Sequence, residues 1–169
     1  VSFAVSSAGN ALVFSDGFDG PFPGSWHLTY TLGSESTTLW GQSGYRKQSG
    51  SSSAWCAGGG SQPQPAGGSY VPNMLAWLYV GPFDLSDATE ATVAFDLWND
   101  CEPSTSLPPP DRLEIWLSTD GFVTPGNQQG IPTPNTNQQW AHSTYSVSSF
   151  RTISALGSKT VYLAFIFRS

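Results

Sequence analysis

The sequence of 169 residues has few charged side chains, and basic ones are especially scarce: 6 lysines and arginines stand against 12 aspartates and glutamates, for a net charge of −6. The basic residues form no cluster, so nothing in the chain could neutralise a row of phosphates or hold an anionic membrane surface. Nucleic acid is therefore not an expected partner. The longest apolar runs, MLAWLYV and TVYLAFIF, fall well short of the roughly 20 residues that a membrane helix needs, so no membrane insertion is expected.

The sequence also lacks an amphipathic helical pattern, because no stretch of a dozen residues repeats its apolar positions with a period near 3.6. Apolar residues instead alternate with period two in the segments TVYLAFIF, RLEIWLS and TVAFDLW. One face of the first segment carries Val161, Leu163, Phe165 and Phe167. Turn-forming segments such as DGFDGPFPG and EPSTSLPPPD separate these runs. The pattern predicts an all-β protein, an antiparallel β-sandwich of jelly-roll type.

The length is sufficient for one domain with a sizeable core and too short for two ordinary domains without a clear linker. We expect a single domain over residues 8–169, preceded by an N-terminal extension strand over residues 1–7. Residues 58–72 and 124–139 show no periodicity and are predicted to be long surface loops. Loops of this kind on a rigid sandwich often carry binding residues.

Five segments together carry a family resemblance: FDGPFPGSW, SGYRKQSGSSSAWCAGGG, LAWLYVGPFDLSDATEATVAFDLWND, DRLEIWLSTDGF and VYLAFIF. From about Phe14 to its end, the chain resembles the MAM-like accessory domains of bacterial secreted proteins, which include cleaved-adhesin modules and domains appended to immune-inhibitor-A-type peptidases. The resemblance implies a jelly-roll sandwich outside the cell or on its surface. It also implies a non-catalytic role in binding surfaces, glycans or other protein domains.

One departure from the family concerns the two ends of the sequence. Family members usually continue past the equivalent of AFIFRS into a last strand, whereas this sequence stops at Ser169, so a sandwich strand is expected to be missing. The segment VSFAVSS precedes the family-like region and places Val1, Phe3 and Val5 on one face. These features suggest a donor strand that completes the sheet of the next subunit and builds a homopolymer. The alternatives are that the segment pairs within its own domain or that the sequence is an excised piece.

The sequence has only two cysteines, Cys56 and Cys101, which are too few for a tetrahedral zinc site unless His27 or His142 joined them. A disulfide is the favoured interpretation for an extracellular protein. Two buried thiols are the main alternative, and a reactive nucleophile is a remote one.

Two tryptophans and two carboxylates lie on the non-core faces of two predicted strands. These are Asp96 and Trp98 in one strand and Glu114 and Trp116 in another, and we expect the two strands to be adjacent. Sugars bind such surfaces because their C–H faces stack on indole rings while their hydroxyls donate hydrogen bonds to carboxylates. The alternatives are that this face is covered and its tryptophans merely packed, or that the acid pair is a glycosidase site.

Acidic residues in turns offer a weaker possibility. Asp16 and Asp19 in SDGFDG, and Asp100 with Glu102 in NDCEP, could supply oxygen ligands to calcium. The sequence Asp-Gly is equally typical of a tight turn. No nucleophile motif is present, so no catalytic residues are expected.

The sequence therefore favours a non-catalytic, extracellular, structural or adhesive domain. Its proposed role is that of a filament subunit assembling head to tail through the strand of Val1, Phe3 and Val5. The alternative is a carbohydrate-binding or adhesion module of a larger secreted enzyme. The expected partners are other copies of the chain or surface glycans and proteins, and the only expected cofactor is calcium, if any.

Overall fold

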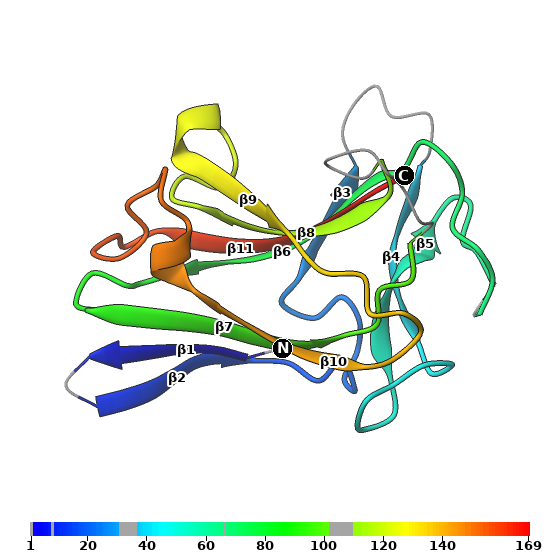
Figure 1. The fold of residues 1–169 in the computed structure, drawn as a ribbon, viewed down its shortest axis with the longest axis horizontal. Coiled ribbons are helices and arrows are strands. Elements are labelled where there is room, and N and C mark those ends of the chain that lie inside the picture. Colours follow the sequence, from blue (N-terminus) through cyan, green and yellow to red (C-terminus); the bar gives the residue numbers. More distant parts are fainter. Residues whose placement is uncertain (1, 8, 31–36, 66, 102–109) are drawn as a thin grey trace. The chain divides into compact units, whose positions relative to one another are not determined.

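A computed structural model describes residues 2–7, 9–30, 37–65, 67–101 and 110–169 (Figure 1). Two residues with predicted roles, Val1 and Glu102, lie outside these ranges. The strands are β1 (Ser2–Ser7), β2 (Gly9–Ser15), β3 (His27–Tyr30), β4 (Thr38–Ser43), β5 (Ser53–Gly60), β6 (Leu75–Phe83), β7 (Glu90–Leu97), β8 (Arg112–Ser118), β9 (Gln128–Pro132), β10 (Ala141–Ser146) and β11 (Val161–Arg168). Two short 3-10 helices, η1 (Pro125–Asn127) and η2 (Val147–Ser149), are the only helices in the described ranges.

The strands form three sheets. One has the order β10-β7-β1-β2, another has the order β3-β6-β11-β8-β9, and β4 pairs with β5 alone. The pairings of β1 with β2 and β7, of β10 with β7, of β3 with β6 and of β4 with β5 are all antiparallel. The predicted fold class, an all-β antiparallel β-sandwich, is therefore confirmed.

The chain divides into two compact units. The first comprises residues 1–16, 80–100 and 115–164, and the second comprises residues 17–79, 101–114 and 165–169. Strands β6, β8 and β11 each contribute residues to both units. The expected single domain over residues 8–169 stays a prediction.

The core of the first unit follows the predicted alternation. In β7, Val93, Phe95 and Leu97 are buried while Asp96 is exposed. The inward residues of β8 and the first half of β11 are buried as well: Ile115, Leu117, Val161 and Leu163. Alternation fails only along β11, where Ala164 and Ile166 are also completely buried. Strand β11 lies in the middle of its sheet, and a central strand can be covered on both faces.

The turn between β8 and β9 is organised by one carboxylate. Asp120 accepts hydrogen bonds from Ser118 Oγ at 2.9 Å, Val123 N at 3.2 Å, Thr124 N at 3.0 Å and Asn127 Nδ2 at 3.0 Å. These bonds, the one from Asn127 first, hold the pKa of Asp120 well below its ordinary value although partial desolvation opposes them. The first part of the loop predicted at residues 124–139 is thus tightly structured and includes η1 and β9.

The N-terminal segment pairs within its own chain in this structure. Strand β1 lies between β2 and β7, with Phe3 opposite Val93 and Val5 opposite Ala91. Of the arrangements that the sequence left open, the structure therefore shows the segment inside the sheet of its own chain.

In the second unit, the glycines that end the segment SAWCAGGG were expected to begin a flexible loop, and this expectation is wrong. Strand β5 runs to Gly60 and pairs with β4 along its length. The two backbones approach so closely that a Cβ on Gly41 would lie 2.4 Å from the carbonyl carbon of Gly58, and one on Gly59 would lie 2.5 Å from Trp40 O. Glycine is required here for close packing rather than for flexibility.

Candidate functional site

The outward face of β7 and β10, in the first unit, carries an exposed polar pair. His142 lies directly opposite Asp96 in the antiparallel register, and His142 Nδ1 is 2.9 Å from Asp96 Oδ1. The side chains are 64% and 40% exposed, respectively, so both remain accessible to a ligand. Because side chains alternate along a strand, the next opposed pair on this face is Ala94 with Thr144.

An aromatic pair continues the same two strands beyond their ends. Trp98 follows β7 and Trp140 precedes β10, and their rings meet edge to face with centroids 6.0 Å apart. Both residues are half-buried. We define Asp96, Trp98, Trp140 and His142 as the β7–β10 strip.

The loop that leads into the strip is fixed to the end of β7. Thr136 N donates to Asn99 O at 2.7 Å, while Asn99 N donates to Thr136 Oγ1 at 2.9 Å. Asn99 Nδ2 also donates to Pro134 O at 3.0 Å. These contacts restrict the segment just before Trp140. Its indole is therefore held in place before any ligand arrives, which reduces the entropy lost on binding.

The strip combines two kinds of group that sugars bind. Indole rings offer apolar surface to the C–H faces of a pyranose, whereas carboxylate and imidazole exchange hydrogen bonds with its hydroxyls. The cross-strand contact with Asp96 orients the His142 ring. The arrangement thus supports reversible recognition of a polar, partly apolar ligand.

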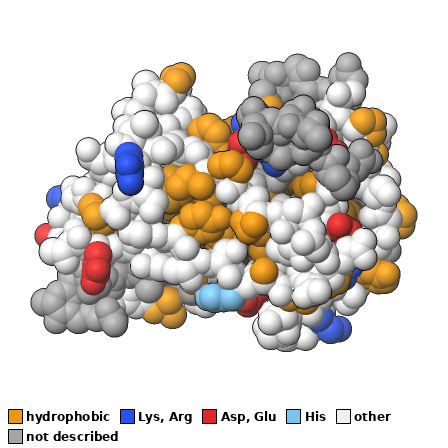
Figure 2. Space-filling model, in the orientation of Figure 1, with side chains coloured by type: hydrophobic (Ala, Val, Ile, Leu, Met, Phe, Trp, Pro, Cys, Tyr) orange, Lys and Arg blue, Asp and Glu red, His pale blue; other side chains and the backbone are white. Residues whose placement is uncertain are grey.

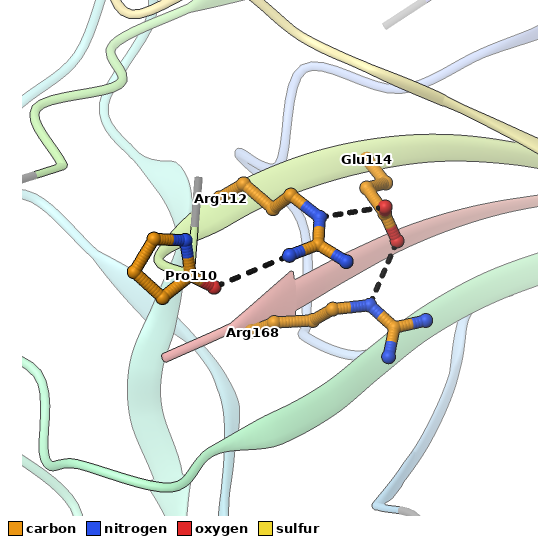
Figure 3. A network of polar contacts seen from close by, with 4 residues as sticks. All are labelled: Pro110, Arg112, Glu114 and Arg168. Atoms are coloured by element: carbon orange, nitrogen blue, oxygen red, sulfur yellow. Dashed lines mark hydrogen bonds and ion pairs between the residues drawn. The ribbon is translucent and has the colours of Figure 1, made fainter. Parts of the chain in front are cut away.

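Glu114 does not belong to this face, so the expected adjacency of its strand to that of Asp96 is wrong. Strands β7 and β8 lie in different sheets. In the second unit, Glu114 is only 8% exposed and is held by two arginines: Arg112 Nε lies 2.8 Å from Oε1, and Arg168 Nε lies 2.8 Å from Oε2 (Figure 3). Both oxygens are engaged, because a partly buried carboxylate needs such partners.

Trp116, the other predicted platform residue, is packed against a neighbouring strand. Its indole lies over Gly130 of β9, where a Cβ on the glycine would come 2.1 Å from Trp116 Cε2. The residue is half-buried and lies on β8, in the sheet that lacks β7. Of the four predicted contact residues, the structure brings only Asp96 and Trp98 together.

The sequence reasoning missed Trp140 and treated His142 as an isolated residue. The signal was present in the segment WAHSTYS, because Trp140, His142 and Thr144 alternate with Ala141 and Ser143. Few of these residues are apolar, and the partner strand could not be read from the sequence.

The two cysteines lie in the second unit. Cys56 and Cys101 are both buried and both reduced in the structure. Burial raises the pKa of the Cys56 thiol far above its ordinary value, and the neighbouring Cys101 adds to the effect. A disulfide between them stays a prediction.

The calcium prediction is likewise untested. Among the described residues, no group of three or more His, Cys, Asp or Glu side chains is placed to hold a metal ion. The carboxylate of Asp19 instead accepts hydrogen bonds from Ser51 and Ser52, the backbone N–H of Ser51 first, and these lower its pKa. It thereby fastens the predicted turn.

The surface supplies some further constraints. Figure 2 shows scattered charged side chains and no basic cluster on the face that it draws. No helix in the described part of the chain is long and apolar enough to cross a membrane.

These strands define an antiparallel β-sandwich with a preformed aromatic and polar strip on one sheet. Among solved structures, the chain is similar to the K1 cleaved adhesin domain of Lys-gingipain from Porphyromonas gingivalis W83, with a TM-score of 0.53 and 16% sequence identity over 91% of this chain and 86% of that domain. No family model matches the sequence, and no curated protein matches it. The similarity establishes the fold and agrees with the cleaved-adhesin resemblance of the sequence.

Proposed function

We propose that the protein is a non-catalytic extracellular adhesion module and that it binds a surface glycan through the β7–β10 strip. The observation that carries the proposal is the juxtaposition of the Trp98–Trp140 pair with the Asp96–His142 pair on two adjacent strands. Similarity of fold to an adhesin domain supports the general role. The scarcity of basic residues favours a neutral glycan over an anionic one.

A neutral polysaccharide suits this strip for a physical reason. The edge-to-face indoles give two differently oriented apolar surfaces, and each can cover part of a sugar ring. Asp96 accepts hydrogen bonds from hydroxyls beside them, and it is held in position by His142. Such a site binds without cleaving the ligand, because it contains one carboxylate and not the pair that most glycosidases use.

The test is retention of the protein on a panel of insoluble neutral polysaccharides, followed by titration against soluble fragments of the best ligand. We expect Trp140→Ala to weaken binding at least about tenfold, which corresponds to about 1.4 kcal/mol. Tyr45→Ala is the matched control, because Tyr45 is 62% exposed and lies in the second unit. Equal retention of both variants, with circular dichroism confirming their folds, would contradict the glycan proposal.

Assembly of copies is a second proposed role, which the sequence connects with the N-terminal strand. The observation that favours it is the way in which β1 and β2 are attached to the rest of the first unit. That attachment also changes which segment would have to be exchanged.

A further inference from the structure

The N-terminal strands form a hairpin that has limited attachment to the rest of the first unit. Strand β1 pairs with β2 from Ser2 opposite Ser15 to Ser7 opposite Gly9. On its other side β1 pairs with β7, from Ser2 opposite Ala94 to Ser6 opposite Glu90. Beyond this pairing, the Phe14 ring lies 5.5 Å from that of Phe83. The hairpin is therefore joined to its sheet along one strand only.

The composition of the hairpin removes the usual barriers to pairing with another molecule. Residues 1–15, VSFAVSSAGNALVFS, contain no charged residue and no proline. Natural sheets protect strands from foreign pairing with charges and prolines. Because the whole chain carries a net charge of −6, two copies repel each other least where they meet through uncharged segments.

The link after the hairpin is short and is fastened at its far end. Strand β2 ends at Ser15, and Asp19 is already bound to Ser51 N at 2.5 Å and to Ser51 Oγ at 2.8 Å. Gln42 Nε2 donates to Phe18 O at 2.6 Å and to Gly20 O at 3.0 Å.

The link is also strained. Phe18 has φ of 62°, in the left-handed region that a bulky residue rarely adopts. The chain passes from the first unit to the second between Asp16 and Gly17. Short, strained links of this kind favour domain exchange, because opening them releases strain while all other contacts re-form in the partner.

We propose that the β1–β2 hairpin exchanges between copies of this chain, so that β1 of one molecule pairs with β7 of a second. The exchanged unit is residues 2–15 as a whole. A lone seven-residue donor strand is disfavoured, because β1 lies between β2 and β7 and its removal would leave β2 without a partner in the sheet. The occupant of the vacated position is the same hairpin from the second copy.

Cysteine pairs placed across β7 can distinguish the two states in the full-length chain. Ser2 and Thr144 both lie opposite Ala94, on the two sides of β7. Opposed antiparallel residues have Cα atoms about 4.5–5.5 Å apart, which suits a disulfide. Ser2→Cys with Ala94→Cys reports on the hairpin. Thr144→Cys with Ala94→Cys is the matched control, because β10 stays with its own chain in either state.

Both variants are oxidised over a range of protein concentrations and run on a denaturing gel without reductant, and mass spectrometry identifies the linked peptides. Exchange predicts disulfide-linked dimers or a ladder for the Ser2 variant, in a fraction that rises with concentration, and monomers for the Thr144 variant. A dimer band signifies closed reciprocal exchange, and a ladder signifies open assembly. Linked monomers only in both variants would overturn the proposal, as would ladders in both or failure of the Ser2 pair to form.

Discussion

Thr136 and Asn99 bind each other in both directions: the Thr136 amide donates to the Asn99 carbonyl at 2.7 Å, and the Asn99 amide donates to the Thr136 hydroxyl at 2.9 Å. The same hydroxyl lies 3.1 Å from Asn99 O. This clamp joins the end of β7 to the loop before β10, and Trp98 and Trp140 follow directly on either side. The order of the aromatic pair therefore depends on a polar contact between segments 37 residues apart.

Removing the hydroxyl by Thr136→Val should weaken both stability and ligand binding. The Asn99 amide would lose its acceptor at a residue that is only 6% exposed, at a cost of about 1–2 kcal/mol. Urea unfolding measures the loss, and polysaccharide titration should show weaker binding because Trp140 is less well held. Thr144→Val, at an exposed position of β10, should leave the unfolding midpoint nearly unchanged. Equal stability of the two variants would show that the clamp is unimportant.

Asp120 should make the fold sensitive to acid. Its pKa in the folded protein lies below the ordinary value of 3.8, so the folded state binds this proton less readily than the unfolded state. The carboxylate therefore stabilises the fold above about pH 4, and the contribution is lost as the pH falls through and below that value. Asp120→Asn should be less stable than the wild type near neutral pH, and the difference should shrink in acid.

Denaturant unfolding between pH 7 and pH 2.5 measures this difference. Asp87→Asn, which removes one exposed negative charge, serves as the control. A constant difference between wild type and Asp120→Asn across the range would contradict the assignment.

Glu114→Gln should destabilise the second unit. The substitution removes the negative charge between Arg112 and Arg168, whose Nε atoms each lie 2.8 Å from one carboxylate oxygen. Breaking such a partly buried group costs roughly 2–4 kcal/mol, since two like charges then remain without their shared counter-ion. Thermal unfolding should show the loss, and Glu90→Gln at an exposed position should not. Polysaccharide binding of the folded variant should be retained, because Glu114 lies outside the β7–β10 strip.

The cysteines make a prediction for protein prepared in an oxidising compartment. We expect a Cys56–Cys101 disulfide, seen as a mass lower by two hydrogens and as resistance to alkylation in denaturant until a reductant is added. Closing a loop of this length would stabilise the fold by about 4 kcal/mol on the chain-entropy model. Alkylation of both cysteines without reductant would show that they are buried thiols, as in the structure.

Local pattern was sufficient to predict the class of fold. Alternation along TVAFDLW and RLEIWLS correctly assigned Val93, Phe95 and Leu97, and also Ile115 and Leu117, to buried faces. It worked because each strand buries one face, so the period is written into the residues themselves. The scarcity of basic residues likewise needed no structure to make nucleic acid an unexpected partner.

Strand pairing was decided only by the tertiary structure. Alternation shows which residues share a face of one strand, but it carries no information on which strand lies beside it. Asp96 therefore found His142 instead of Glu114, and Trp98 found Trp140 instead of Trp116. The sequence by itself determined the kinds of side chain available for binding, whereas the non-local hydrogen bonds of the sheets decided which of them meet.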